Sequence, residues 1–117
     1  MLRDYSTQVP SGGWRVITVT QPGDGEVGGD SLKMSGTVTI APFENNLSYH
    51  ILDAEGNELA AGPVPVMAMD MGAPGTFEVT IPLDHVSPGT RAWIEIRDLS
   101  AADGSLLGMD SVEIWRK

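Results

Sequence analysis

The stretch SLKMSGTVTI, residues 31–40, alternates polar and apolar side chains along almost its whole length. Polar side chains share one side of this segment, and the other side carries Leu32, Met34, Val38 and Ile40. A period of two residues is that of a strand with one buried face in an antiparallel sheet. Gly36 interrupts the apolar side, which indicates either a β-bulge or a point where another backbone passes close. No segment has the 3.6-residue apolar period of a helix, so the sequence predicts an all-β fold.

Further segments of this kind lie on both sides of residues 31–40. Strands are expected over residues 14–20, 31–40, 47–51, 58–61, 76–81, 90–98 and 109–115. Gly, Pro, Asn and Asp residues occupy the segments between them, as turns require. Seven or eight short strands at this spacing predict an immunoglobulin-like, two-sheet antiparallel sandwich. The predicted core contains Leu32, Met34, Val38, Leu47, Tyr49, Ile51, Phe77, Val79, Ile94, Ile96, Val112 and Ile114.

Length and composition limit the classes of function. The chain has 117 residues, which is enough for one domain with a hydrophobic core. We expect a polar N-terminal tether over residues 1–13, followed by the domain over residues 14–117. The net charge of −9 repels nucleic acid and anionic membranes, and no apolar run reaches the ~20 residues that insert into a bilayer. The N-terminus lacks the features of a signal peptide, and the absence of cysteine excludes disulfides and thiolate sites.

Five short motifs follow one another along the chain. They are ITVTQPG at residues 17–23, LKMSG at residues 32–36, the Phe43-Glu44 pair, the Asp53-x-x-Gly56 hairpin and SAADGS at residues 100–105. In the order and spacing of these motifs, residues 17–114 resemble the immunoglobulin-like domain of bacterial spore germination. The resemblance implies an extracellular or cell-envelope module within a longer secreted protein or lipoprotein, often beside a second germination-type domain. It carries over no catalytic residues, and the methionine-rich segment 67–71 has no counterpart in it.

Neither histidine has the sequence context of a catalytic group. His50 lies in an expected strand on the face opposite Leu47, and His85 lies in a connection beside Asp84. The chain has no Gly-x-Ser-x-Gly or His-Glu-x-x-His motif that would supply a nucleophile or a catalytic metal. The sequence therefore predicts two surface histidines in a protein that is not an enzyme and uses no cofactor.

One loop contains oxygen ligands at alternating positions. Asp53, Glu55 and Asn57 resemble part of a calcium cage, but no bidentate glutamate ends a twelve-residue loop. A hairpin turn needs the same residue types for its backbone conformation and local hydrogen bonds. We therefore predict a turn, and no metal site.

Two tryptophans are expected on the outer face of the last two strands. Alternation leaves Trp93 and Trp115 outside, while Ile94 and Ile114 point inward. One register places Trp93 opposite Trp115, and a two-residue slip places Arg97 opposite Glu113, so the register stays open. The tryptophans either cover each other, or are capped by arginines or the N-terminal segment, or they form a binding platform.

Met67, Met69 and Met71 recur at a spacing of two residues within an irregular stretch. Methionine often fills gaps in a core because its side chain is flexible, and it also forms adaptable docking patches. The segment is therefore either an inward-facing strand or core-covering loop, or a binding surface.

These observations together predict a non-catalytic interaction or spacer module. Its partner is expected to be a protein or a neighbouring domain of a larger envelope protein. The candidate binding residues are Trp93, Trp115, Met67, Met69 and Met71. Two alternatives remain: a carbohydrate-binding module that stacks sugars on the tryptophans, and a proteinase inhibitor that presents a loop within residues 62–75.

Overall fold

The computed structural model describes residues 2–70 and 72–117, and about 60% of the chain is strand and 3% helix. The strands in these residues are β1 (Asp4–Gln8), β2 (Trp14–Arg15), β3 (Ile17–Gln21), β4 (Gly25–Val27), β5 (Ser31–Val38), β6 (Asn46–Leu52), β7 (Glu58–Ala68), β8 (Gly75–Pro82), β9 (Arg91–Leu99) and β10 (Leu106–Arg116). The one helix is a single 3-10 turn, η1 (Phe43–Asn45). The all-β prediction is confirmed. No helix in the described residues has the length and apolarity needed to cross a bilayer.

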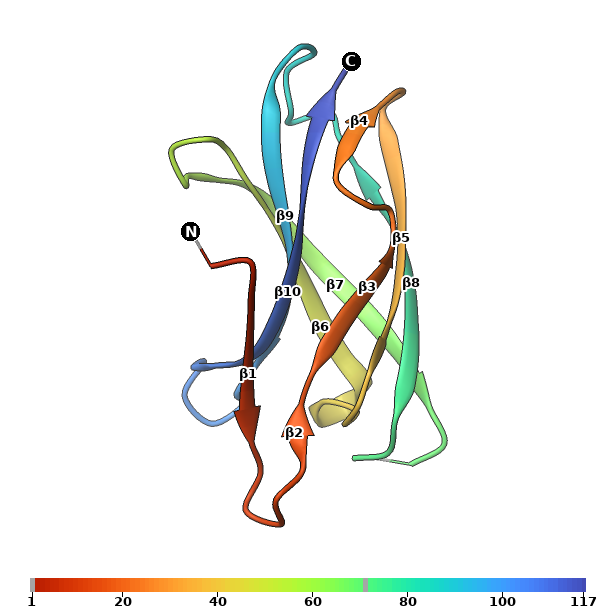
Figure 1. Ribbon diagram of the computed structural model, residues 1–117, viewed down its shortest axis with the longest axis vertical. Coiled ribbons are helices and arrows are strands. Elements are labelled where there is room, and N and C mark those ends of the chain that lie inside the picture. Colours follow the sequence, from red (N-terminus) through yellow and green to blue (C-terminus); the bar gives the residue numbers. More distant parts are fainter. Residues whose placement is uncertain (1, 71) are drawn as a thin grey trace.

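The strands form one hydrogen-bonded path that nearly closes into a barrel (Figure 1). Along this path the order is β2-β1-β10-β9-β6-β7-β8-β5-β3. Strand β7 connects the two halves, because residues 58–65 pair with β6 and residues 66–68 pair with β8. β4 lies off the path and pairs with β10 in parallel, whereas the pairs along the path are antiparallel. A separation into two sheets is therefore not confirmed.

The described residues contain ten strands, more than the seven or eight expected. The expected strand over residues 14–20 is divided at Val16, whose N–H donates to the Thr39 side chain instead of a neighbouring strand. Residues 4–8, within the segment expected to be a tether, form β1 and pair with β10. β4 has only three residues and follows a turn, so it is too short to show an alternating pattern.

Several short sections cover the outer edge of β10. β1 pairs with residues 108–110 and β4 with residues 114–116. Between them, the Asp24 carboxylate accepts a hydrogen bond from the N–H of Glu113 at 2.8 Å. The Asp110 carboxylate reaches across to β3 and accepts the N–H of Val19 at 2.7 Å. Side chains thus complete the barrel where the strands do not pair, and they satisfy backbone donors that would otherwise lack partners.

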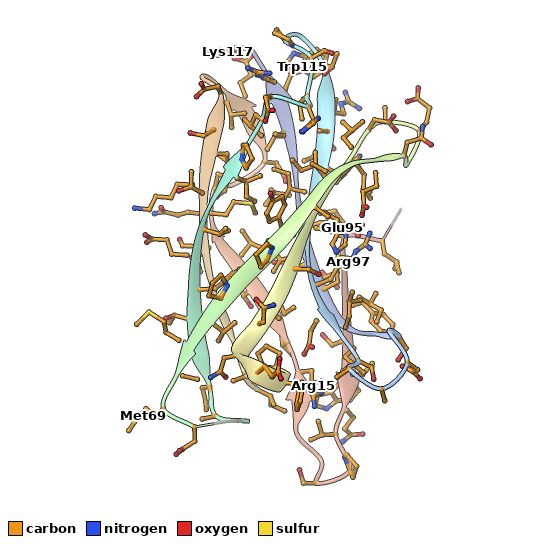
Figure 2. The ribbon with its side chains drawn as sticks, turned by 180° about the vertical axis from the view of Figure 1, so that it is seen from behind. Arg15, Met69, Glu95, Arg97, Trp115 and Lys117 are labelled. Atoms are coloured by element: carbon orange, nitrogen blue, oxygen red, sulfur yellow. The ribbon has the colours of Figure 1, made fainter. Side chains whose placement is uncertain are left out.

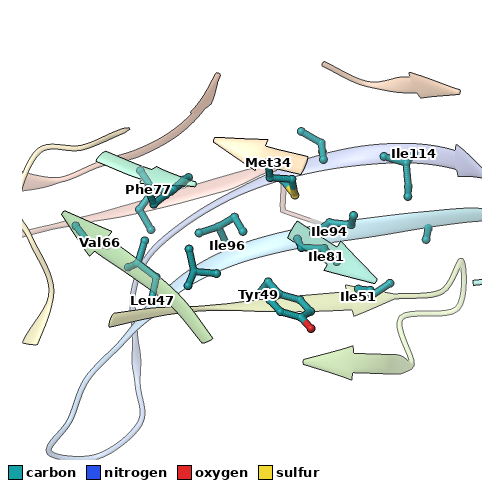
Figure 3. Close-up of a cluster of buried hydrophobic side chains, with 14 of the residues drawn as sticks. Met34, Leu47, Tyr49, Ile51, Val66, Phe77, Ile81, Ile94, Ile96 and Ile114 are labelled. Atoms are coloured by element: carbon teal, nitrogen blue, oxygen red, sulfur yellow. The ribbon is translucent and has the colours of Figure 1, made fainter. Parts of the chain in front are cut away.

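The core fills the interior of this barrel, and Figure 3 shows part of it. The predicted core residues are buried, except for Leu32 and Val79, which are partly buried and pack against the cluster. Alternation did not predict Val64 and Val66, which are also buried. They lie in β7, which was expected to end at residue 61 because prolines follow. Pro63 and Pro65 occur where β7 pairs only with β6, and prolines are tolerated at such unpaired edges.

Two glycines lie directly under aromatic rings. Gly36 is paired with Phe77 across β5 and β8, and a Cβ atom at Gly36 would stand 2.5 Å from the Phe77 ring and 2.2 Å from the carbonyl oxygen of Thr18. Gly62 is paired with Tyr49 across β6 and β7 in the same way, with the ring 2.5 Å from its Cβ position. Gly36 therefore marks a close backbone approach, as predicted. The β3–β5 register also shifts at this point.

A charged pair closes one end of the core. Asp98 is 3% exposed, and its carboxylate lies 3.3 Å from the Arg15 guanidinium of β2. Burial raises the pKa of Asp98, and the nearby Arg15 charge and hydrogen bond oppose this increase. The pair links β9 to β2 near the end of the hydrogen-bonded path. These two strands are not neighbours along the path, so the pair adds a side-chain connection between them.

Candidate functional site

The outer face of β9 and β10 carries both candidate tryptophans. Glu113 lies opposite Trp93, and Trp115 lies opposite Arg91. This is neither of the two registers considered from the sequence. An irregularity between Leu106 and Gly108 shifts the pairing after the turn, and alternation cannot reveal such a shift. Both rings still lie on one face, with a charged residue next to each.

The N-terminal segment covers Trp93. The Arg3 guanidinium lies over the ring, 5.5 Å from its centre, at a distance typical of a cation–π contact. Arg3 also donates two hydrogen bonds to the Asp24 carboxylate at 2.9 and 3.1 Å, and its carbonyl oxygen accepts the Ser111 hydroxyl. Trp93 is only partly exposed as a result. Its position agrees with the expectation of capping by an arginine and the N-terminal segment.

Trp115 is more accessible and is 43% exposed (Figure 2). The Arg91 guanidinium lies 5.4 Å from its ring centre and is also paired with Glu113 at 2.9 Å. Arg91 thus fixes one side of the ring while much of the indole stays in solvent. An exposed, oriented tryptophan can supply a large apolar contact area at small entropic cost.

A hollow of about 350 Å³ lies beside Trp115, between β4 and β10. Its lining comprises Asp24, Gly25, Glu26, Glu113, Ile114 and Trp115. The Glu113 N–H and the Arg3 guanidinium hold the pKa of Asp24 below its ordinary value, so this carboxylate is ionised at neutral pH. Each of the three carboxylates has a cationic partner: Asp24 pairs with Arg3, Glu26 with Lys117 and Glu113 with Arg91. These pairs lie at the surface and contribute little stability, so a ligand that carries positive charge beside apolar groups can compete for the carboxylates next to the exposed indole.

His50 has closer partners than the sequence predicted. Its side chain is 12% exposed, and its Nε2 atom lies 2.9 Å from the Ser48 hydroxyl. Its Nδ1 atom is bonded to the Glu58 carboxylate, so His50 is more enclosed than the ordinary surface histidine that was expected. Ser48 precedes His50 by two residues on β6, and Glu58 begins the partner strand β7. The predicted hairpin between these two strands was therefore the sequence signal from which this contact could have been inferred. His85 is 58% exposed beside Asp84, as expected for a surface histidine.

The order hydroxyl, imidazole and carboxylate is that of a serine hydrolase triad. Hydrolysis also needs donors for the negative oxygen of the intermediate. The guanidinium opposite Ser48 in register is that of Arg97, which is paired with Glu95 at 2.7 Å (Figure 2). Its charge is therefore already compensated by Glu95, which is 7% exposed. The arrangement is best described as two separate polar groups: Ser48, His50 and Glu58 link β6 to β7, and Glu95 and Arg97 pair with each other on β9.

The Asp53 loop is a hydrogen-bonded turn. One oxygen of Asp53 accepts the N–H groups of Glu55 and Asn57, and the other accepts the Asn57 amide. These bonds, that from the Asn57 N–H above all, lower the pKa of Asp53. Gly56 has a φ of +86°, as such a turn requires. Among residues 2–70 and 72–117 there is no group of three acidic or histidine side chains that could hold a metal ion.

Met69 lies at the far end of the molecule from Trp115 (Figure 2), and Met67 lies two residues before it in β7. Met67 is 78% exposed and Met69 is 95% exposed, so the alternative in which these side chains fill the core does not apply to either of them. Their neighbours Val66 and Ala68 are the more buried residues in this part of β7. Met71 falls outside the described residues. The structure thus keeps the tryptophans and the methionines on separate surfaces.

The fold and this outer face define a class: an all-β domain with an aromatic and acidic surface beside the edge of its last strand. The family model of the immunoglobulin-like domain of bacterial spore germination matches residues 16–105, and the chain belongs to this family. The resemblance carried by the sequence motifs is therefore confirmed. No curated protein sequence matches the chain. Domains of this family are generally non-catalytic.

Proposed function

We propose that this domain is an interaction or spacer module of a bacterial cell-envelope or spore-germination-type protein. It acts outside the cell or in the envelope, as part of a longer secreted protein or lipoprotein, and its halves behave as the two layers of a sandwich joined through β7. Family membership supports the non-catalytic character of the module. The observation that carries the proposal of a binding role is the exposed Trp115 beside the acidic hollow.

The chemistry of this face favours a protein partner with a basic side chain next to an apolar one. The basic group would enter the hollow near Asp24, Glu26 and Glu113, while the apolar group would pack on the free part of Trp115. Burial of a large aromatic ring provides much of the energy of many protein interfaces. The surrounding carboxylates would select against acidic partners.

The alternatives from the sequence have less support. A sugar platform needs an accessible ring face, and Arg3 lies over one of the two tryptophans. An inhibitor needs a rigid exposed loop, but residues 62–68 of the expected loop (residues 62–75) belong to strand β7. Titration of the tryptophan fluorescence with cell-wall oligosaccharides, and assays against common proteinases, are expected to show neither activity.

Replacement of both tryptophans tests the binding face. A protein captured from envelope extracts is first purified, and its affinity is then measured for the wild type and for Trp93→Ser/Trp115→Ser. We expect binding to be lost in the double variant with little change in melting temperature. Trp14→Ser is a matched control, because Trp14 is 53% exposed but belongs to β2 rather than to this face. Unchanged affinity in the double variant, or a large fall in its melting temperature, would contradict the proposal.

A second experiment addresses catalysis. The protein should hydrolyse p-nitrophenyl acetate no faster than its Ser48→Ala variant. Arg97 lies opposite Ser48 but is paired with Glu95, so its guanidinium is not free to stabilise the negative oxygen of the intermediate. A rate that falls at least tenfold in the variant would identify Ser48 as a nucleophile and end the non-catalytic proposal.

A further inference from the structure

The chain concentrates its soft donor atoms in one place. It contains six methionines and no cysteine, and three of the six methionines lie within residues 67–71. Thioether sulfur is a soft ligand that prefers copper(I) and similar ions over magnesium or calcium. Since cysteine is absent, thioethers are the strongest soft donors that this protein can offer.

Two of these sulfurs are presented to solvent. Met67 and Met69 are 78% and 95% exposed, whereas Met34 and Met109 are 0% and 3% exposed. Core packing therefore explains the presence of Met34 and Met109, but it does not explain the presence of Met67 and Met69. An unbranched methionine on a surface leaves its sulfur free to bind and its three side-chain torsions free to adapt.

The backbone places the two exposed methionines close together. Met67 lies near the end of β7, and Met69 follows the last residue of that strand. Met69 lies in a bend, and the Cα atoms of residues two apart are separated by at most about 7 Å in any conformation. Both side chains line one hollow of about 350 Å³, together with Ala68, Pro74, Gly75 and Thr76. Flexible side chains from these two positions can bring both sulfurs to one ion in that hollow.

Charge and surroundings suit a soft cation of low charge. The net charge of −9 attracts cations to the surface in general. The lining of the hollow offers no carboxylate or imidazole, so hard divalent ions find no ligand set there. We propose that Met67 and Met69 together bind one soft monovalent metal ion, such as copper(I), at an open and readily exchangeable site. This function is separate from the proposed partner contact at Trp115.

Silver(I) is a suitable probe because it has the same charge and ligand preference as copper(I) and is not oxidised by air. Silver nitrate is titrated, in a chloride-free buffer, into protein labelled with ¹³C at the methionine methyl groups. We expect the Met67 and Met69 signals to shift together and to saturate at one equivalent, while Met34 and Met109 do not move. The buried methionines thus serve as an internal control within the same molecule.

A pair of variants provides the second control. Met67→Leu/Met69→Leu should weaken silver(I) binding at least tenfold, and it should weaken copper(I) binding equally in an anaerobic competition with bicinchoninate. Met34→Leu/Met109→Leu removes the same number of thioethers and should bind as the wild type does. Absence of methyl shifts, or saturation at two equivalents, would overturn the shared site.

Discussion

The packing of Phe77 over Gly36 leads to a sharp prediction about stability. Gly36→Ala adds one methyl group on the inner side of β5. That methyl would stand 2.2 Å from the Thr18 carbonyl oxygen and 2.5 Å from the Phe77 ring, far inside the contact distance of about 3.5–4.0 Å. Phe77 is 3% exposed, so its ring is packed within the core. The Thr18 oxygen belongs to the backbone of β3, so a change of rotamer cannot relieve that clash.

The expected cost follows from these two contacts. Overpacking of a core costs about 1–3 kcal/mol, and a clash with backbone belongs at the upper end of that range. Alanine also lowers the conformational entropy of the unfolded chain relative to glycine, which stabilises the fold by about 0.4–1 kcal/mol and offsets part of this cost. We therefore expect Gly36→Ala to lower the free energy of unfolding by about 2 kcal/mol, or to lower Tm by about 8 °C in a domain of this size. Gly62→Ala should cost less, because only the Tyr49 side chain has to move.

Urea denaturation, followed by tryptophan fluorescence and by far-UV circular dichroism, measures these differences. Gly28→Ala is the matched control, since no heavy atom lies within 4 Å of its Cβ position and its φ is not in the left-handed region. This control should be neutral or slightly stabilising. If Gly36→Ala unfolds at the same urea concentration as Gly28→Ala, Phe77 does not pack over Gly36 and the reasoning fails.

Two further predictions concern charged groups. Arg15→Ala leaves the buried Asp98 carboxylate without its cation and should cost about 2 kcal/mol at pH 7, below the usual range for a fully buried pair because Arg15 is 25% exposed. The loss of unfolding free energy should shrink at low pH, because the raised pKa of Asp98 lets its carboxyl group become neutral there. An equal loss at pH 4 and pH 7 would contradict this. The control is Lys33→Ala, which breaks an exposed pair and should not change stability measurably. Asp53→Ala should destabilise the protein at neutral pH but not near pH 2. A carboxylate whose pKa is lowered by folding stabilises the fold at pH values above its unfolded pKa. This stabilisation is lost as the pH falls through the pKa of the folded state. Thermal unfolding at several pH values tests this, and a pH-independent effect would show that the turn does not depend on the ionised carboxylate.

Alternation was sufficient to predict the class of fold and most of the core. It worked for residues 31–40 because each inward residue there is apolar and each outward residue is polar. It failed for β7, where Pro63 and Pro65 suggested a loop although both lie at an unpaired edge. It also missed β1, whose residues alternate too weakly to indicate a buried face.

The candidate site was only partly predictable, for a different reason. The shared face of Trp93 and Trp115 follows from local alternation, but their cross-strand partners depend on an irregularity near Leu106. Arg3 reaches Trp93 and Asp24 from the beginning of the chain, and a contact between residues so far apart in sequence leaves no local signal. The contacts among Ser48, His50 and Glu58 were easier to predict, since these residues belong to one hairpin.

The edge of β10 is covered by the separate short strands β1 and β4, and this has a consequence for self-association. β10 is eleven residues long and alternates in sequence like a strand that readily recruits another strand when its edge is open. β1 covers that edge through only three residue pairs, at residues 108–110. A β1 strand that detaches from its own β10 can add to the β10 of a second molecule and make the same hydrogen bonds there. We therefore expect concentrated protein to form dimers by exchange of the N-terminal strand, and a chain lacking residues 1–13 to aggregate through the vacant edge.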